Sequence, residues 1–418
     1  MSNLPFCLWP WFHQKINPNG TVVPCCMWKE EPHEMYSVSR SKNHNDYINS
    51  EEMNEVRELF KTQTPHHKCS TCVYEETTSN DSSSSMRLKS FKTAKLLGID
   101  LENFDTNSHQ LLSEEVSISN LCNLKCRMCS QHNSSKWIAD EVAMGNKSIG
   151  LQQSNWVLTQ QQVETLIRIK FHGGEPLLHQ DIICRELNKI RDANRLHLLS
   201  VYITTNMTTD ISNELANILL NTKKTIINCS IDAVGELNDY IRSDSNWNDV
   251  EKNIKSLLVL SKIKKPEFTF IFNINSVINV FNAQYFDKIL DWGLQYTQFI
   301  YPILQIYPEF QNARNLPDNY KNEIIKHYTQ CLSTIDYKSR LLNVKTYKPL
   351  KNFSYFVNEY NSIIEHLKNP PLIEFKSWKN ALSYHNNFLD KRRHTNLKDV
   401  NITLFNIINE PDESINDR

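Results

Sequence analysis

From about residue 113 onward, apolar and polar positions alternate between two periodicities. Short runs with a period of two, typical of strands, are followed by longer runs with helical spacing. The expected strands are EVSISNL (115–121), IKFH (169–172), LLSVYITT (198–205), TIINCSID (225–232), FTFIFNINSV (268–277) and QFIYPIL (298–304). The expected helices between them cover 159–168, 181–195, 210–222, 246–263 and 281–296. Repeated strand–helix units indicate parallel strands with right-handed crossovers, and six of them favour an open, partial (β/α)6 barrel.

The strand pattern is confined to the middle of the chain. After LPDNYK (316–321) only helical patterns follow, at 318–335, 353–368 and 372–390, with Pro370 and Pro371 separating the last two. The first 110 residues are polar, include the serine-rich run 79–86, and contain a helical pattern at 50–62. We therefore expect an α/β protein with three parts. They are a loop-rich, metal-stapled module (1–110), the partial barrel (111–315) and a helical extension (316–418).

Overall charge and hydropathy exclude some classes of partner. The formal net charge is −1, so no global basic field attracts nucleic acid or an anionic membrane. No stretch approaches the roughly 18 apolar residues of a membrane span, and the first residues lack the basic start of a secretory signal. We expect a cytoplasmic protein with no nucleic-acid or membrane partner. Thiols stay reduced in the cytoplasm, so clustered cysteines indicate metal binding there.

Three of the eleven cysteines form the run C-x3-C-x2-C within LCNLKCRMCSQH. Cys122, Cys126 and Cys129 could bind zinc together with His132. The alternative, which we favour, is a 4Fe–4S cubane whose fourth iron stays open to a ligand that is not protein. The run follows the end of a strand, where a parallel barrel places its active site, and this position favours the open cluster. Three other cysteines, Cys184, Cys229 and Cys331, stand alone and are expected to be small buried apolar residues.

Glycine is scarce, with 8 residues in 418, so its positions are informative. Gly173 and Gly174 are adjacent in GGEP, at the end of the second expected strand. Two glycines let the backbone approach a ligand without a Cβ clash. Glu175 offers a carboxylate to a cationic amino group, and Pro176 fixes the turn. The alternative is an ordinary strand-to-helix turn.

The C-x3-C-x2-C run after strand one and GGEP at the end of strand two together resemble the radical S-adenosylmethionine (SAM) enzymes. The resemblance implies that the methionyl amino and carboxylate groups of SAM chelate the open iron. An electron from the reduced cluster then cleaves the sulfonium, and a 5′-deoxyadenosyl radical abstracts hydrogen from substrate. It also implies an external electron donor of the flavodoxin or ferredoxin type. One departure is Met128, because the residue before the third cysteine is commonly aromatic in the family.

The resemblance implies further cofactor contacts at the ends of later strands. Asn206 and Ser230 are expected near the SAM carboxylate or ribose, and Arg242 is expected to pair with the carboxylate. Asn275 and Val277 are expected near the adenine. For each of these the alternative is a turn cap or a surface ion pair.

No catalytic acid or base can be named from the sequence. His172, Asp232, Tyr301 and Glu309 are polar residues near expected strand ends. Cys229 could donate hydrogen, as a thiol does in some radical epimerases, although burial within its strand is the favoured interpretation.

A second set of cysteines precedes the barrel. Cys7 and Cys25 flank NPNGTVVP, whose NG turn predicts a β-hairpin that brings them together, and Cys69 and Cys72 add a C-x2-C pair. Four thiolates hold either zinc or a fully ligated cubane, and counting thiols does not separate the two. The pattern resembles the twitch or SPASM auxiliary-cluster module, which implies an auxiliary 4Fe–4S cluster on these four residues. Cys26 is the alternative to Cys25.

Two classes of function follow from these expectations. The first is a radical SAM enzyme; relatives with auxiliary clusters often modify ribosomally made peptides, so a peptide or protein substrate is favoured. A small molecule such as a sugar, nucleoside or lipid head group is the alternative substrate. The second class is a non-catalytic binding or electron-transfer protein stapled by zinc or clusters.

Overall fold

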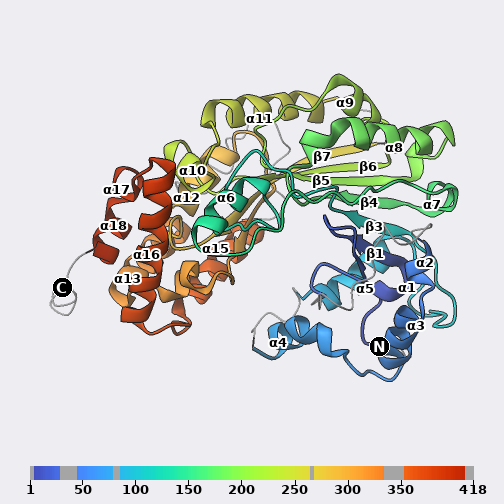
Figure 1. Ribbon diagram of the computed structural model, residues 1–418, viewed down its shortest axis with the longest axis horizontal. Helices are drawn as coiled ribbons and strands as arrows, with labels where there is room; N and C mark the ends of the chain where they lie inside the picture. Colours follow the sequence, from blue (N-terminus) through green and yellow to red (C-terminus); the bar gives the residue numbers. More distant parts are fainter. Residues whose placement is uncertain (1–3, 29–44, 79–84, 264–267, 334–352, 410–418) are drawn as a thin grey trace.

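A computed structural model describes residues 4–28, 45–78, 85–263, 268–333 and 353–409 (Figure 1). Within these residues one sheet of eight strands organises the chain, in the order β2-β1-β3-β4-β5-β6-β7-β8. The strands are β1 (His13–Ile16), β2 (Val22–Val23), β3 (Ser113–Val116), β4 (Arg168–Phe171), β5 (Ser200–Thr205), β6 (Lys224–Ser230), β7 (Thr269–Ile278) and β8 (Ile300–Leu304). The sheet starts at β2 and ends at β8, so it is open.

The six strands expected from the sequence correspond to β3 to β8, and they pair in parallel in chain order. The first of them was misplaced, because β3 ends at Val116 and the expected strand ran from 115 to 121. The helices that connect them are α6 (Ile138–Ala143), α7 (Gln160–Thr165), α8 (Gln180–Asp192), α9 (Asn213–Leu219), α10 (Glu236–Ile241), α11 (Trp247–Ser261) and α12 (Phe286–Gly293). Polar side chains cap them: Thr159 and Gln162 form a capping box on α7, and Ser212 caps α9. The predicted partial barrel is confirmed.

The amino-terminal segment joins this sheet. It contains α1 (Trp9–Phe12), α2 (Asn45–Ile48), α3 (Glu51–Lys61), α4 (Ser70–Thr78) and α5 (Met86–Leu96). The expected hairpin is present: β1 and β2 are antiparallel, and the turn closes with Gly20 N–H donating to the Asn17 carbonyl over 2.9 Å. Strand β1 also pairs in parallel with β3, with Lys15 opposite Glu115. This pairing joins residues about a hundred positions apart, so no local pattern predicted it.

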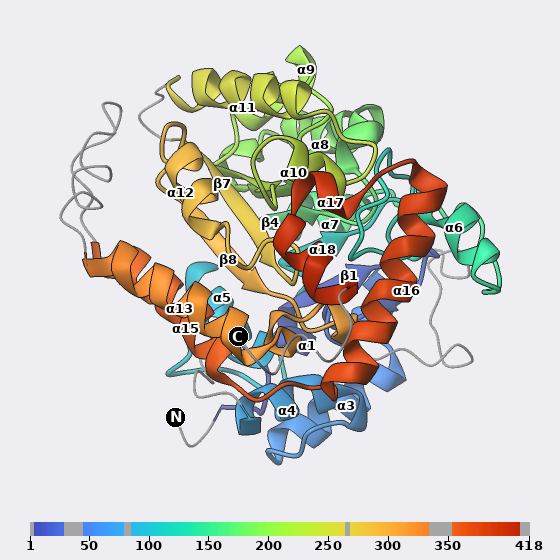
Figure 2. The same cartoon turned by 90° about the vertical axis from the view of Figure 1, so that its left-hand side faces the viewer.

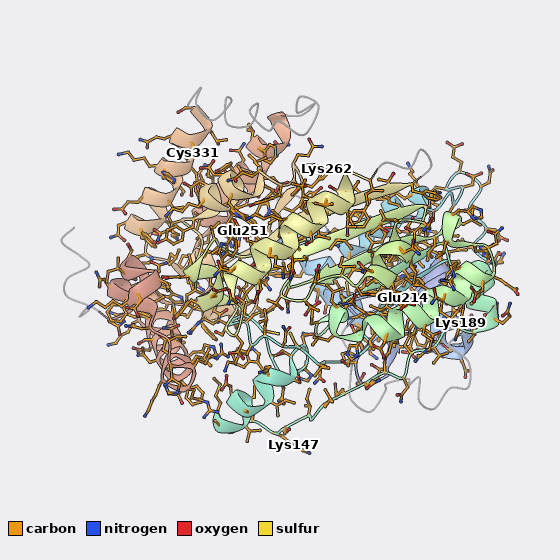
Figure 3. The ribbon with its side chains drawn as sticks, turned by 90° about the horizontal axis from the view of Figure 1, so that it is seen from above. Lys147, Lys189, Glu214, Glu251, Lys262 and Cys331 are labelled. Atoms are coloured by element: carbon orange, nitrogen blue, oxygen red, sulfur yellow. The ribbon has the colours of Figure 1, made fainter. Side chains whose placement is uncertain are left out.

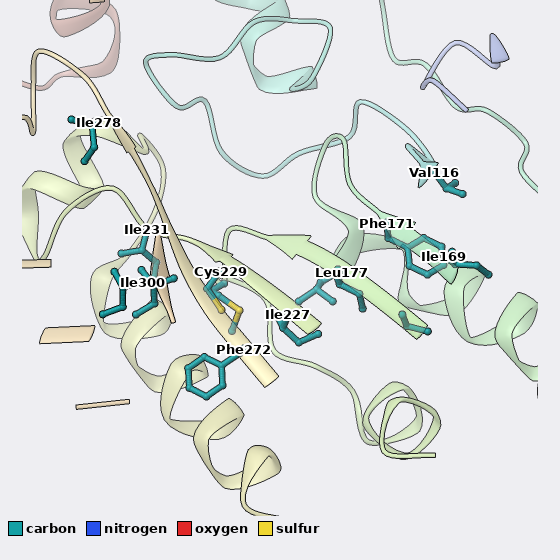
Figure 4. Packing of buried hydrophobic residues seen from close by; sticks show 14 of the residues in the cluster. Val116, Ile169, Phe171, Leu177, Ile227, Cys229, Ile231, Phe272, Ile278 and Ile300 are labelled. Atoms are coloured by element: carbon teal, nitrogen blue, oxygen red, sulfur yellow. The ribbon is translucent and has the colours of Figure 1, made fainter. Parts of the chain in front are cut away.

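The two faces of the sheet differ in polarity. Residues on β5 and β6 alternate between fully buried and half-buried positions. The buried positions pack against the helices, and Figure 4 shows Ile227, Cys229 and Phe272 close together in this core. The half-buried positions include Lys170, Tyr202 and Asn228. A parallel sheet usually carries apolar residues on both faces, so this polar face is available for chemistry.

The helical extension consists of α13 (Asp318–Ser333), α15 (Phe353–Lys368), α16 (Phe375–Arg393), α17 (Leu397–Val400) and α18 (Ile402–Asn409). The first three match the helices expected from the sequence. Figure 2 shows α16, α17 and α18 lying together on the side of the molecule that faces the viewer. None of the helices in the described ranges has the length and apolar character needed to cross a bilayer. The serine-rich run at 79–84 and part of the expected 318–335 helix lie outside the described residues.

Candidate active site

The three-cysteine run forms a loop between β3 and the 3-10 turn η3 (Ser135–Trp137). Two contacts fix its backbone: Cys129 N–H donates to the Cys126 carbonyl over 2.9 Å, and the Trp137 indole N–H donates to the same carbonyl over 2.8 Å. All three thiols are partly buried. Burial raises the pKa of the Cys122 thiol to about 12 and raises the pKa of Cys126 and Cys129 as well. Thiols with a raised pKa stay protonated at neutral pH, and binding of a metal displaces their protons.

Hydrogen-bond donors surround these sulfurs. Leu124 N–H lies 3.4 Å from Cys122 Sγ, and the Asn206 amide nitrogen lies 4.0 Å from it. Arg242 Nη1 lies 3.7 Å from Cys126 Sγ. Donors of this kind stabilise thiolates and tune the potential of a cluster that they hold.

The spacing of the cysteines bears on the zinc alternative. Within the described ranges, a single group of three His, Cys, Asp or Glu ligands has its ligand atoms within 4.8 Å of one another, and it lies elsewhere. His132, the fourth ligand expected for zinc, is exposed. Neither cysteine set is therefore preformed around one small ion. A cubane is larger than a single ion, so it does not require thiols as close together as those of a zinc site.

The GGEP turn packs directly on the cysteine loop. A Cβ on Gly174 would lie 2.3 Å from the Leu121 carbonyl oxygen, and one on Gly173 would lie 2.4 Å from Ser117 Oγ. Both glycines also have positive φ, at +57° and +78°. The close approach expected for a ligand is thus made, in the structure, by the chain itself. The two motifs are in contact, and Glu175 N–H donates to the Leu121 carbonyl over 2.8 Å.

Glu175 is buried, and both of its carboxylate oxygens accept backbone hydrogen bonds. Leu177 N–H donates to Oε1 over 3.0 Å, and Asn206 N–H donates to Oε2 over 2.7 Å. Burial raises the pKa of this carboxyl group. In the structure Glu175 caps the turn that begins at Pro176 and ties strand end β4 to strand end β5. A carboxylate has further lone pairs, so the amino group expected from the sequence is not excluded by these bonds.

Arg242 is engaged with protein groups. Its Nε lies 2.8 Å from Asp232 Oδ2, and both side chains are buried. Asp232 Oδ1 accepts the Val277 N–H over 2.8 Å. The guanidinium thus stands beside Cys126 and is already paired with a carboxylate. Ser230 ends β6 opposite Asn275 on β7, half-buried on the polar face.

The other polar residues singled out in the sequence lie in different surroundings. His172 Nε2 is 2.7 Å from Glu115 Oε1, and Lys170 Nζ is 3.2 Å from the other oxygen of the same carboxylate. The sequence analysis did not anticipate a role for Glu115. The signal that could have identified it was a charged residue within a short, buried strand. Tyr301 lies on β8 opposite Asn275.

Two of the sequence candidates do not lie on the polar face. Glu309 is exposed on the 3-10 turn η6 (Glu309–Gln311), and Cys229 is fully buried in the helix-facing core, as the favoured interpretation expected (Figure 4).

The amino-terminal cysteines converge from separate elements. Cys7 precedes α1, Cys25 follows β2, Cys69 ends the 3-10 turn η1 (His67–Cys69), and Cys72 lies in the first turn of α4. Burial is the main cause that raises the pKa of Cys7 and of Cys69 to about 12, and negative charge on the neighbouring thiol of Cys72 adds to it. The pKa of Cys25 is raised by burial and by the nearby thiols of Cys26, Cys7 and Cys72. Charge on Cys7 or Cys72 thus acts on each of the other thiols whose pKa is raised.

Cys26 points to a different environment. Burial raises its pKa, and the charges that act on it are those of Glu115, Lys170, Lys15 and Lys89. Cys26 also adds to the raised pKa of its neighbour Cys25. Charge on Cys7 and Cys72 thus acts on Cys25, whereas the main charges that act on Cys26 come from Glu115 and three lysines, so Cys25 stays the predicted ligand.

A buried arginine within the cysteine loop connects the loop to the helical extension. The side chain of Arg127 is 1% exposed and forms an ion pair with Asp390 of α16. Its other donors reach Asn386 Oδ1 over 2.9 Å, Thr395 Oγ1 over 2.8 Å and the Tyr240 carbonyl over 3.0 Å. The guanidinium also lies 3.6 Å from the centre of the Tyr240 ring. The sequence analysis passed over this residue, although an arginine between two ligand cysteines was a visible signal.

A second arginine of α16 holds the segment after the loop. Arg393, also 1% exposed, lies 2.9 Å from Asp140 Oδ2. It donates to the Lys125 carbonyl over 2.7 Å and to Ser243 Oγ over 3.1 Å. Its guanidinium lies 4.6 Å from the centre of the Trp137 ring. Helix α16 thus contacts the cysteine loop at Lys125 and Arg127 and the segment after the loop at Asp140.

Comparison with protein families identifies two domains in the chain. Residues 116–292 match the Radical SAM superfamily, and residues 7–73 match the SPASM iron–sulfur cluster-binding domain. The first range contains the three-cysteine loop and GGEP, and the second contains all the amino-terminal cysteines discussed above. Together these domains imply a SAM-binding 4Fe–4S cluster, an auxiliary 4Fe–4S cluster and SAM as cofactors.

Solved structures with similar chains were also found. They include anSMEcpe with bound AdoMet (19% identity, 53% of this chain and 62% of that chain, TM-score 0.38). Streptococcus suis SuiB bound to S-adenosylmethionine shares 16% identity over 67% of this chain and 61% of that chain, with a TM-score of 0.33. TsrM from Kitasatospora setae shares 11% identity over 53% and 40%, with a TM-score of 0.33. The chain thus spans less than two thirds of the length of each. A search of curated proteins gave no match.

Proposed function

We propose that this chain, whose residues 116–292 match the Radical SAM superfamily, cleaves S-adenosylmethionine reductively and uses the resulting 5′-deoxyadenosyl radical to abstract hydrogen from a peptide or protein. The observation that carries the proposal is the contact between the two motifs. The three-cysteine loop and the GGEP turn lie against each other at adjacent strand ends, with Gly174 packed on the Leu121 carbonyl. A site for a cluster and a site for its organic ligand would then share one edge of the sheet.

The proposed ligands of the SAM-binding cluster are Cys122, Cys126 and Cys129. When bound, the reduced cluster supplies the electron for cleavage. The residues of the chain hold the thiolates in place and surround them with donors, namely Leu124 N–H and the Asn206 and Arg242 side chains. These donors offset the cost of burying negative sulfur.

The proposed contacts with SAM lie around this loop. They are the residues predicted from the sequence: Gly173, Gly174, Glu175, Pro176, Asn206, Ser230 and Arg242. Arg242 is already paired with Asp232 through Nε. The remaining N–H groups of its guanidinium would therefore bind the SAM carboxylate. A flavodoxin- or ferredoxin-type protein would deliver the electrons.

The proposed auxiliary cluster is held by Cys7, Cys25, Cys69 and Cys72, which leaves no iron open to substrate. The match to the SPASM domain supports a peptide or protein substrate, because enzymes with such modules often modify ribosomally made peptides. The polar face of the sheet between the two cysteine sets offers charged groups to such a substrate, including Lys170 and the Glu115–His172 pair.

The test of cleavage is anaerobic reconstitution with iron and sulfide, followed by reduction, addition of SAM and quantification of 5′-deoxyadenosine. We expect about eight irons per chain, four for each cubane. Replacing Cys122, Cys126 and Cys129 together by Ala should remove about half of the iron and all of the 5′-deoxyadenosine. Cys184→Ala, at a buried cysteine outside both sets, is the control and should keep both. A parent protein with both clusters intact that forms no 5′-deoxyadenosine would contradict the proposal.

The peptide assignment is tested separately. A short peptide encoded beside the gene is synthesised with deuterium on its carbon-bound positions and incubated with the reduced enzyme and SAM. Transfer of deuterium into 5′-deoxyadenosine is expected. Cleavage of SAM without such transfer from any encoded peptide would favour a small-molecule substrate.

A further inference from the structure

We propose that Asp287, His327 and Cys331 form a binding site for a single divalent transition-metal ion, with zinc as its probe. The site is independent of the proposed radical chemistry. Asp287 lies in the first turn of α12, and His327 and Cys331 are four residues apart on α13. Figure 3 shows Cys331 at the opposite end of the molecule from Lys189 and Glu214.

The ligand atoms are already spaced for one ion. The Sγ of Cys331, a ring nitrogen of His327 and a carboxylate oxygen of Asp287 all lie within 4.8 Å of one another. His327 Nε2 is 3.1 Å from Asp287 Oδ2 and 3.7 Å from Cys331 Sγ. Tetrahedral zinc, with bonds of about 2.0 to 2.3 Å, separates its nitrogen, oxygen and sulfur ligands by roughly 3.3 to 3.6 Å. An ion would enter with small side-chain adjustments.

Packing between the two helices holds these residues in register. The Tyr328 hydroxyl, on α13 next to His327, donates to the Ala283 carbonyl. The same hydroxyl accepts the Phe286 N–H, at the start of α12, over 3.0 Å. Tyr328 is fully buried, so the two helices are joined at the level of the site. The ligands therefore come from rigid elements and not from loops.

A second observation points to a ligand at this position. Asp287 Oδ1 is buried, yet it accepts no hydrogen bond from any described residue. Buried carboxylate oxygens normally have partners, and an ion beside Asp287 would provide one. The ligand types also select the ion, because one thiolate, one imidazole and one carboxylate suit borderline metals such as zinc. A water molecule would complete the four positions.

The site also accounts for an expectation that was wrong. Cys331 was expected to be a small buried apolar residue, as Cys184 and Cys229 are. It is instead partly exposed and beside a histidine. A thiol in that position has a chemical use that a core residue lacks.

The experiment uses the full chain after both clusters have been assembled, so that their cysteines are occupied. Zinc is added in excess, free ion is removed by desalting, and bound zinc is counted by mass spectrometry. We expect about one zinc per chain, with one sulfur at about 2.3 Å and lighter ligands at about 2.0 to 2.2 Å in the zinc X-ray absorption spectrum. Cys331→Ser and His327→Ala should each weaken zinc binding at least tenfold. Gln330→Ala, at an exposed neighbour on α13, is the matched control and should bind as the parent does.

Three results would overturn the proposal. They are a cluster-loaded parent that retains no zinc, zinc surrounded by three or four sulfurs, and unchanged binding in both Cys331→Ser and His327→Ala. Formation of 5′-deoxyadenosine is measured on the same samples and should be unchanged in these variants. Loss of zinc with full SAM cleavage supports the metal site, whereas absence of cleavage in all samples concerns the proposed function alone.

Discussion

Replacing Asp390 by Ala tests whether the helical extension holds the cysteine loop in place. Asp390 lies on α16, and its carboxylate pairs with Arg127. Arg127 stands between Cys126 and Cys129 in the sequence. The substitution removes the carboxylate that pairs with the Arg127 guanidinium, and the Arg127 side chain is 1% exposed. It also removes the acceptor of the Leu397 N–H, at 3.0 Å, and that of the Thr395 hydroxyl, at 2.8 Å.

The expected cost follows from the burial of the pair. Removing one partner of a buried ion pair destabilises a protein by about 3 to 5 kcal/mol, because the other charge stays buried and unpaired. Asp390 is 13% exposed, and Asn386 and Thr395 still accept from Arg127, so the lower end applies. We expect a loss of about 3 kcal/mol in the free energy of unfolding. We also expect the SAM-binding cluster to be lost faster than the auxiliary cluster.

Two measurements check this prediction. Urea unfolding of the anaerobic apoprotein gives the free energy, and iron content over time gives cluster retention. The double variant with Arg127→Met should recover part of the lost stability, because it removes the unpaired charge. Glu365→Ala is the control; it breaks an exposed ion pair with Lys368 on α15 and should change stability by less than about 0.5 kcal/mol. A loss below about 1 kcal/mol in Asp390→Ala, with normal cluster retention, would refute the reasoning.

Three further predictions concern the turn, the auxiliary cluster and pH. Gly174→Ala should destabilise the chain by about 3 kcal/mol or more and abolish the SAM-binding cluster, because its Cβ would lie 2.3 Å from a backbone oxygen. The control is Gly145→Ala, which lies at φ +91° in open space and should cost about 1 kcal/mol when urea unfolding is measured. Cys25→Ser should reduce iron from about eight toward about four per chain, whereas Cys26→Ser should keep both clusters; equal losses would contradict the placement of Cys25 among the thiols. Burial raises the pKa of Glu114 from 4.5 to about 7, so the folded state holds its proton longer than the unfolded state. Its contribution to stability is therefore present below about pH 4.5 and is lost, by up to about 3 kcal/mol, as the pH rises to about 7. Glu114→Gln should remove that decline when unfolding is measured at several pH values, and an unchanged slope would show that the carboxyl titrates normally.

Local spacing along the chain was enough for the order of the elements and for the cysteine sets, and the resemblance to a known family then implied the cofactors. Strands with a period of two and helices with capping residues such as Ser212 are specified by neighbouring residues, so the six parallel strands followed from the pattern. The cysteine runs and the adjacent glycines were also readable, because metal ligands and close backbone contacts tolerate few residue types. The family comparison identifies the same two domains.

Tertiary structure alone decided what surrounds those motifs. Pairing of β1 with β3, and of Arg127 with Asp390, joins residues 100 and 263 positions apart, and nothing in either local sequence selects its partner. The close contact of Gly174 is with the chain's own carbonyl, and Cys25 comes near Cys7 and Cys72 only through folding. Sequence patterns report the period of burial along one element, whereas the direction of a side chain and the identity of its distant partners depend on how the elements pack together.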